Sequence, residues 1–547
     1  MSGNNHYSTA TEPGADARKA FAAARKYFLR GNLSDAQRWA EAVLDLAPSY
    51  ISGRRLLADI LIQRGMHQAA RAQLRQALQL SSEQPDKRLP VKLHFATSYF
   101  REGDLASALQ TLRSTEFAAL AKIKTSTLGQ LGYLHTLCES HETALEIYEA
   151  VLLREPNSAE NLFNCAAANR AMGNLERAEA LYDRAIQLNP QDWEAYKNRS
   201  ELRRQSTDRN HVRQLEAQLM DDNKPDFAAI QLNFALAKEL EDLGDYSRSF
   251  SVLQSGSEVR RKHIEYDVAR DLDTMSAISG NFAADFLSAP EVPHDRGKNI
   301  IFILGMPRTG STLLDRILCA APGVVSAGEP DTFARLLLQV AAESGNAQDE
   351  NVILSAGETI DINRVGVAYE KQMHARAQLL GGQRIIDKNP MNFLYLGWIA
   401  RALPAAKIIH LQRDPMDTCY AIYKTLFKSA YPFSYRQKEL ARYYCGYREL
   451  MAHWCQVVPD RIIELDYEQL VSDLPAAGRR IFRQCALSWD DAIQDTYYGR
   501  GQGTATASAA QVRQPVYRSS LEKWKHYRAE LQPMVDVLDA AGLFEPA

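Results

Sequence analysis

The sequence predicts a multidomain fold, in which an all-α array of helical repeats is followed by an α/β domain with a parallel sheet. Residues 16–288 are rich in Ala, Leu, Arg and Glu and contain a recurring frame. From residue 299 to 547, strand-like apolar runs alternate with amphipathic helical patterns, which is the signature of βαβ units. Between them, APEVPHDRGK at 289–298 combines two prolines, a glycine and mixed charges, and is typical of a linker.

The composition is that of an ordinary globular protein, with 46% hydrophobic and 24% charged residues. The net charge of −3 favours neither nucleic acid nor an anionic membrane as a partner. The seven cysteines are scattered and form no CxxC pair, which argues against a zinc site and favours a reducing compartment. We expect a cytoplasmic protein with residues 1–15 disordered, no signal peptide and no membrane span, because no apolar run is long enough.

A frame of small residues recurs through the helical half. It begins with glycine or, once, glutamate, and places alanine five residues later; the pairs are Gly31 with Ala36, Gly65 with Ala70, Gly103 with Ala108, Glu139 with Ala144, and Gly173 with Ala178. Successive starts are separated by 34, 38, 36 and 34 residues, and a weaker copy begins at Gly244.

This period resembles that of the tetratricopeptide repeat, and five frames in phase favour it over a generic helical array. The resemblance implies stacked pairs of antiparallel helices that form a solenoid with a concave groove. The solenoid could be a docking or oligomerisation scaffold, or it could present a peptide to the neighbouring domain. The sequence leaves both roles open, and it leaves the oligomeric state unknown.

Five strands are predicted after the linker, and a polar segment follows each of them. The strands are expected at Ile300–Leu304, Val324–Ala327, Arg384–Asp387, Lys407–Gln412 and Arg461–Leu465. The polar segments are Arg308–Thr312, Gly328-Glu329, Lys388-Asn389-Pro390, Arg413-Asp414-Pro415 and Asp466-Tyr467-Glu468. Ligands of parallel sheets bind beyond the carboxyl ends of the strands, so the set predicts one shared cleft. Any one of these residues taken alone could be a helix cap or a solvated turn.

The first strand, its loop and the following helix form the architecture that binds phosphate groups. In NIIFILGMPRTGSTLLDRIL, Gly305, Gly310 and Thr312 fit the nucleotide-triphosphate pattern G-x-x-x-x-G-K-[ST]. Ser311 stands at the lysine position, and Arg308 lies inside the loop. A loop without the lysine that reaches the β/γ-phosphates suits a different anion. The alternative is a structural turn that contains two glycines.

Six short motifs in order resemble those of sulfotransferases that use 3′-phosphoadenosine 5′-phosphosulfate, and among them the protein-tyrosine sulfotransferases. The resemblance covers about 299 to 530. The motifs are Pro307–Leu313, Glu329 21 residues after Arg308, Lys388-Asn389-Pro390, Arg413-Asp414-Pro415, Tyr467–Val471, and Ser508–Val512 with Pro515, Val516, Lys523 and Trp524. The union of helical repeats with such a domain resembles bacterial tetratricopeptide-repeat sulfotransferases.

The resemblance implies transfer of a sulfuryl group to an acceptor hydroxyl, with adenosine 3′,5′-bisphosphate as product and no metal. It implies Glu329 as general base, Lys388 beside the bridging oxygen of the leaving phosphate, and Ser508 at the sulfuryl oxygens. The donor is then expected at a larger set: Arg308, Thr309, Gly310, Ser311 and Thr312 for the 5′-phosphosulfate, and Arg413, Tyr467 and Lys523 for the 3′-phosphate.

The expected acceptor is tyrosine in a peptide or protein that the repeats could dock, with a carbohydrate, lipid or small phenol as alternatives. Two rival functions are a P-loop kinase, which Ser311 disfavours, and a scaffold that binds nucleotide without turnover. One departure from the family concerns Ala421, which stands eight residues after Arg413 where a serine is usual. Thr418, one helical turn earlier, is the candidate substitute.

Overall fold

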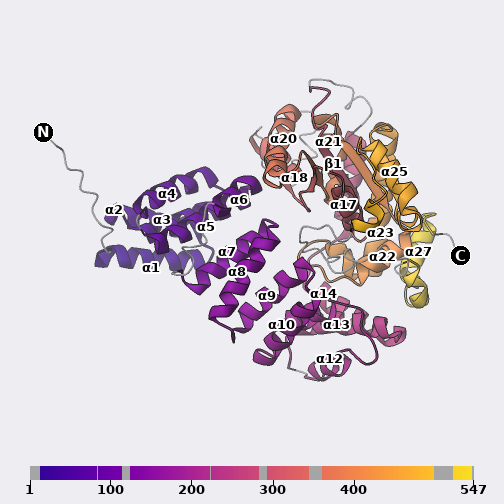
Figure 1. Ribbon diagram of the computed structural model, residues 1–547, viewed down its shortest axis with the longest axis horizontal. Coiled ribbons are helices and arrows are strands. Elements are labelled where there is room, and N and C mark those ends of the chain that lie inside the picture. Colours follow the sequence, from indigo (N-terminus) through magenta and orange to yellow (C-terminus); the bar gives the residue numbers. More distant parts are fainter. Residues whose placement is uncertain are drawn as a thin grey trace. The chain divides into compact units, whose positions relative to one another are not determined.

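The protein consists of two compact units, residues 1–156 and residues 157–547 (Figure 1). The computed structural model describes residues 13–82, 84–113, 123–221, 223–282, 292–343, 360–497 and 521–544. Helices come first along the chain and a parallel sheet follows, which confirms the predicted fold class. The division between the units falls between two repeats, so the later helices share a unit with the sheet. The domain limits 1–15, 16–288, 289–298 and 299–547 stay a prediction.

The first unit is a succession of paired helices (Figure 1). Its helices are α1 (Ala15–Leu29), α2 (Leu33–Leu46), α3 (Ile51–Gln63), α4 (His67–Leu80), α5 (Pro85–Glu102), α6 (Leu105–Arg113), α7 (Thr125–Leu137) and α8 (His141–Arg154). Within each pair, the second helix packs against the first. Over the described parts of the chain, no helix is both long and apolar enough to cross a bilayer.

The start of each frame forms the turn between paired helices. Every start has a positive φ, from 58° at Glu139 to 88° at Gly173, and Gly244 follows with 81°. This left-handed conformation ends a helix at low cost when the residue is glycine, which explains why glycine recurs there. The alanine five residues later is fully buried in all five frames, because a larger side chain would keep the two helices apart.

The second unit continues with seven helices among its described residues before the sheet. They are α9 (Ala159–Met172), α10 (Leu175–Leu188), α11 (Trp193–Ser200), α12 (Val212–Leu219), α13 (Asp226–Leu243), α14 (Tyr246–Lys262) and α15 (Val268–Asn281). The pairs α9 with α10 and α13 with α14 repeat the packing of the first unit.

The sheet has five parallel strands in the order β2-β3-β1-β4-β5. The strands are β1 (Ile300–Gly305), β2 (Val324–Ser326), β3 (Arg384–Asp387), β4 (Lys407–Gln412) and β5 (Ile462–Asp466). All five lie within one residue of their predicted positions. The central strand β1 pairs with β3 on one side, where Phe302 faces Asp387, and with β4 on the other, where Gly305 faces Leu411.

Helices and short helical turns follow the strands. They are α17 (Ser311–Cys319), α18 (Thr332–Ala341), α20 (Ile362–Leu379), η3 (Pro390–Tyr395), α21 (Leu396–Ala402), α22 (Pro415–Tyr423), η4 (Pro432–Tyr435), α23 (Gln437–Val457), α24 (Tyr467–Ser472), α25 (Leu474–Gln484), α26 (Ile493–Thr496), η6 (Lys523–Tyr527) and α27 (Gln532–Ala540). We call the elements from β1 to α27 the sheet domain.

Each face of the sheet is covered by its own hydrophobic core. Ile300, Phe302 and Leu304 of β1 pack into one core, and Ile301 and Ile303 pack into the other. All six residues of β1 are buried. A strand buried on both faces needs a continuous apolar run rather than an alternating pattern, as this sequence has.

The first of these cores extends into α13, α14 and α15. Phe234, Phe250 and Met275 belong to the same buried cluster as Phe302. Phe282, directly after α15, packs edge-on against Trp398 with ring centroids 4.2 Å apart. These helices therefore cover part of the sheet domain and are not a separate layer.

The glycine at position 397 gives a test of this shared core. A Cβ there would lie 2.5 Å from the Phe282 ring and 2.8 Å from Trp454, so Gly397→Ala is expected to cost about 1–3 kcal/mol. Denaturant unfolding followed by fluorescence measures the loss. Gly280→Ala on α15 is the control, since no atom lies within 4 Å of the added Cβ. Equal stability of the two variants would contradict the packing described.

Candidate active site

The loop between β1 and α17 is shaped by three residues with positive φ. These are Gly305 at 142°, Arg308 at 68° and Gly310 at 98°. A Cβ on Gly305 would lie 2.6 Å from the carbonyl oxygen of Leu411, so β4 requires glycine there. A left-handed arginine is uncommon, and such conformations gather at binding sites. Gly310 is the N-cap of α17 and has no side chain that could cap it, and a helix N-terminus of this kind is suited to an anion.

The carboxyl ends of β1, β4 and β5 meet at Gly310. The Tyr467 ring lies against its Cα, where an added Cβ would be 2.5 Å from Cδ2 of the ring. The guanidinium carbon of Arg413 lies 4.9 Å from the centroid of that ring, within the range of a cation–π contact. Nη1 of Arg413 donates to the carbonyl oxygen of Arg308 at 3.2 Å. Three loops that are far apart in sequence thus meet through Arg308, Gly310, Arg413 and Tyr467, which we call the Arg413 cluster.

The other predicted residues of the loop are largely buried. Thr309 donates its hydroxyl to the carbonyl oxygen of Met306 at 2.9 Å, which stabilises the turn. Ser311 and Thr312, in the first turn of α17, are 9% and 7% exposed. Thr418 is fully buried and donates to the carbonyl oxygen of Arg413 at 3.3 Å, so its hydroxyl already has a backbone acceptor.

The ends of β2 and β3 bring Glu329 and Lys388 together. Nζ of Lys388 donates to Oε1 of Glu329 at 2.5 Å. The lysine side chain is 1% exposed and the glutamate side chain 42%, so the carboxylate is the accessible member of the pair. Asn389 donates to the carbonyl oxygen of Pro330 at 2.9 Å and fixes the two strand ends to each other. In the strand order, β1 separates this pair from the Arg413 cluster.

Asp387 is a completely buried carboxyl group directly before Lys388. It accepts hydrogen bonds from the hydroxyl of Tyr369 at 2.5 Å and from the amide of Asn392 at 2.9 Å. Burial raises the pKa of Asp387 to about 7, against the opposing effect of these two hydrogen bonds. The group therefore changes its charge near neutral pH beside the Glu329–Lys388 pair.

Lys523 lies at the start of η6, which is held to the Arg413 cluster by Asp417. The backbone N–H of Glu522 donates to Oδ2 of Asp417 at 2.8 Å, and this oxygen lies 3.7 Å from Nη2 of Arg413. Ser508, the third predicted catalytic residue, lies outside the described residues. The structure thus places the other predicted side chains at the strand ends or beside them.

Two residues near this cluster had no role in the sequence analysis. Lys424 caps the C-terminus of α22, the helix that begins after Arg413, and Glu241 lies on α13. Glu241 accepts hydrogen bonds from both Lys424 and Lys523. Lys424 could have been noticed as a cation close to a binding motif, whereas nothing in the repeat pattern distinguishes Glu241.

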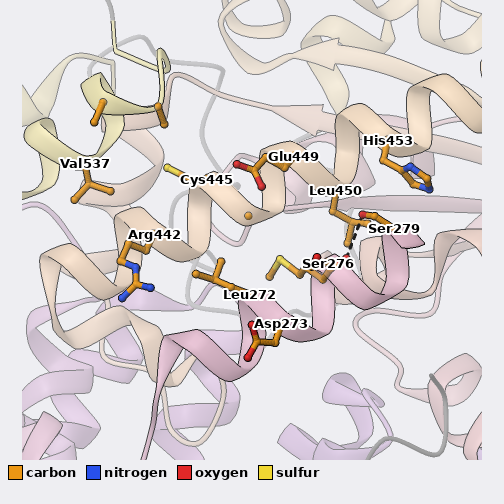
Figure 2. Close-up of a pocket in the computed structure, with 14 residues that line it drawn as sticks. Leu272, Asp273, Ser276, Ser279, Arg442, Cys445, Glu449, Leu450, His453 and Val537 are labelled. Carbon is orange, nitrogen blue, oxygen red and sulfur yellow. Dashed lines mark hydrogen bonds between the residues drawn. The ribbon is translucent and has the colours of Figure 1, made fainter. Parts of the chain in front are cut away.

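A separate pocket of about 820 Å³ lies between α15 and α23 (Figure 2). Leu272 and Ser276 of α15 and Cys445 and Glu449 of α23 are among the residues that line it. None of the predicted site residues that the structure describes lines this pocket. Within the described ranges, no group of three or more His, Cys, Asp or Glu side chains could hold a metal ion.

Two parts of the chain match known families. Residues 300–491 match the Sulfotransferase family, and residues 139–198 match the Tetratricopeptide repeat. The chain carries a tetratricopeptide repeat and, C-terminal to it, a sulfotransferase domain. The family match spans all five strands and the strand-end residues from Arg308 to Tyr467.

Individual relatives are distant. An uncharacterized protein of Aquifex aeolicus is 28% identical over 378 residues, which are 67% of this chain and 48% of that protein. The protein-tyrosine sulfotransferase of Drosophila melanogaster is 25% identical over 271 residues, 45% of this chain and 52% of that protein. The chain spans about half the length of these two relatives. The solved sulfotransferase domain of the Synechococcus PCC 7002 olefin synthase aligns with 47% of this chain and all of that domain, at 20% identity and a TM-score of 0.29.

The raised pKa of Asp387 predicts a pH-dependent stability. Between its unfolded value near 4 and its folded value of about 7, the folded protein binds the proton more tightly, so stability falls as pH rises through this window. The slope for one proton is at most about 1.4 kcal/mol per pH unit. Unfolding free energies of wild type and Asp387→Asn, measured at steps from about pH 5 to pH 8, should diverge across the window and run parallel above it. The exposed Asp460→Asn serves as control, and parallel curves throughout would contradict the assignment.

Proposed function

We propose that the protein transfers a sulfuryl group from 3′-phosphoadenosine 5′-phosphosulfate to an acceptor hydroxyl. The observation that carries the proposal is the convergence of the strand ends. The loop that follows β1 (residues 306–310, here called the anion loop) contacts Arg413 and Tyr467, which follow β4 and β5 on one side of β1. An accessible carboxylate paired with a buried lysine follows β2 and β3 on the other side. Family membership of the sheet domain supports the same reaction class.

The residues present fit a donor that carries two separate phosphate groups. The bare N-terminus of α17 and Arg308 suit the 5′-phosphosulfate, because helix N–H groups and a guanidinium both favour anions. Because the Tyr467 ring lies against Gly310, position 310 has no room for a side chain, and the loop presents its backbone there. Arg413, stacked on Tyr467, suits the 3′-phosphate, and Lys523 is the further cation. Ser311 in place of the lysine is consistent with a donor that has no β/γ-phosphate pair.

Glu329 and Lys388 carry the chemistry in this proposal. The donor supplies a sulfuryl group whose bond to the departing phosphate breaks with its electron pair on the phosphate oxygen. Glu329 takes the proton of the acceptor hydroxyl as the hydroxyl oxygen attacks sulfur. Lys388 stabilises the charge on the leaving bridging oxygen. Ser508 is assigned to the sulfuryl oxygens, and no metal takes part.

The proposed acceptor is tyrosine in a peptide or protein. The Drosophila relative is a protein-tyrosine sulfotransferase, and tetratricopeptide repeats are a common support for peptide binding. In this proposal the repeats dock the polypeptide that carries the acceptor. A carbohydrate, lipid or small phenol is the alternative acceptor class, which a screen with labelled donor distinguishes.

Replacement of Glu329 tests the reaction. Glu329→Gln should lower the rate of sulfur-35 transfer from labelled donor by about 10²- to 10⁴-fold, because the amide cannot accept the proton. Its affinity for adenosine 3′,5′-bisphosphate should stay within about twofold of wild type, since the base does not bind the phosphates. Asp331→Asn, two residues away and exposed, is the control and should transfer normally. Full activity of Glu329→Gln would remove Glu329 from the proposal.

Replacement of Gly310 in the loop tests donor binding, whereas replacement of Glu329 tests the transfer step. Gly310→Ala forces a Cβ into the Tyr467 ring at a φ of 98°, so bisphosphate affinity measured by calorimetry should fall about tenfold or more. Gly323→Ala has the same kind of backbone, with φ 74°, but its nearest neighbour is 3.9 Å away. This control should bind as wild type does. Unchanged affinity of Gly310→Ala would place the donor elsewhere.

A further inference from the structure

Glu241 connects α13 to the sheet domain through one carboxylate. Nζ of Lys424 donates to its two oxygens at 2.8 and 3.1 Å, and Nζ of Lys523 donates at 2.9 Å. The hydroxyls of Tyr420 and Tyr527 also donate to this group, the latter at 3.3 Å. All four donors lie at least 179 residues away in sequence, on α22, at its C-terminal end or on η6.

The carboxylate is a costly group to bury without partners, and here it has four. Its side chain is 11% exposed. Burial opposes ionisation, but the charges of Lys424 and Lys523 outweigh it and hold the pKa of Glu241 well below its usual range. Loss of a buried counter-charge leaves its partners unpaired, which is a large penalty. The contact is therefore a specific anchor and not an exposed ion pair of small effect.

Both lysines are attached to elements that hold the anion loop. Lys424 ends the helix that begins beside Arg413, and the positive charge of Arg308 contributes to a lowered pKa of Lys424, after burial and Lys523. Lys523 follows Glu522, whose N–H binds Asp417 next to Arg413. Lys424 is thus linked through α22, and Lys523 through Glu522 and Asp417, to Arg413, which donates to the backbone of the loop after β1.

Glu241, Lys424 and Lys523 together retain a net positive charge after pairing. Glu241 supplies one negative charge against two ammonium groups, each with three N–H donors. The side chains of Lys424 and Lys523 are 27% and 38% exposed, so neither lysine is sealed in the interior. Ala421, one turn before Lys424 on α22, offers no hydroxyl to a phosphate. A cation one turn later on the same helix can supply the interaction that a serine would have made.

We propose that Glu241 is a positioning residue that holds Lys424 and Lys523 toward the phosphate groups of the donor, so that α13 of the helical region completes the donor site. This inference rests on the proposed sulfotransferase function. Lys424 is then a donor-binding residue beyond those of the sequence motifs. The helices before the sheet act on the donor as well as on any acceptor polypeptide.

The test compares the full-length variants Glu241→Gln and Glu258→Gln with wild type. Glu258 is an exposed carboxylate on the adjacent helix α14 and contacts Gln254, so it is a matched control. Calorimetric titration with adenosine 3′,5′-bisphosphate should show affinity about tenfold weaker for Glu241→Gln and unchanged for Glu258→Gln. In turnover, the donor KM should rise while kcat at saturating donor changes little, a split that general loss of structure would not give.

The pH profile of the affinity separates positioning by charge from packing alone. The groups that face Lys424 are Glu241, Lys523, Tyr420 and Arg308. Burial, Lys523 and Arg308 disfavour the charged form of Lys424, whereas Glu241 favours it, so the affinity of Glu241→Gln should fall further than that of wild type as pH rises above neutral. The wild-type profile should be flatter over the same range.

The outcomes distinguish failure of the role of Glu241 from failure of the sulfotransferase function. Equal affinity of Glu241→Gln and wild type overturns the role of Glu241 and leaves the sulfotransferase function standing. Absence of bisphosphate binding by wild type overturns both. If Glu241→Gln does not fold, Lys424→Gln carries the test: weakened binding supports the inference, and wild-type binding refutes it.

Discussion

The burial of β1 on both faces of the sheet is the constraint on which the site depends. Every residue of this strand is buried, and its neighbours β3 and β4 hold it by parallel hydrogen bonding. Because the five strands are parallel, they all end at the same edge of the sheet, which brings Arg308, Glu329, Lys388, Arg413 and Tyr467 to that edge. The ion pair of Glu329 with Lys388 and the contact of Arg413 with the Tyr467 ring then fix these side chains there. Gly305 then allows the backbone of Leu411 to come close, and Gly310 allows the Tyr467 ring to come close, where a side chain would collide.

Much of this arrangement could be predicted from the sequence because its causes are local. An apolar run of strand length specifies a strand buried on two faces, and all five strands lie within one residue of their expected limits. The recurring frame of the helical repeats also has local causes. Even Glu139, which breaks the glycine pattern, adopts the left-handed turn that the frame requires, with φ 58°. Polar residues directly after strands identify the edge at which a ligand can bind.

Other features depend on contacts between distant segments, and no sequence pattern specified them. The sequence does not distinguish Glu241 from the other glutamates of the helical repeats. Its role depends on α22 and η6, whose side chains contact it on α13. Phe282 lies at a helix end but packs between Trp398 and Trp454, so the helices α13 to α15 share the core of the sheet domain. The hydroxyl of Thr418, the candidate substitute for the absent serine, donates to the carbonyl oxygen of Arg413. The orientation of a hydroxyl on a helix follows from packing, which spacing along the chain does not reveal.

In the proposed function, the loop after β1 binds a phosphosulfate donor and not a nucleoside triphosphate. The most direct measurement is calorimetric titration of the full-length protein with adenosine 3′,5′-bisphosphate and, separately, with ATP and magnesium. We predict binding of the bisphosphate without added metal and no binding of magnesium-ATP, since Ser311 replaces the lysine that contacts a β/γ-phosphate pair. Preference for magnesium-ATP would contradict the sulfotransferase function and favour a P-loop kinase, and absence of binding to both ligands would favour a scaffold.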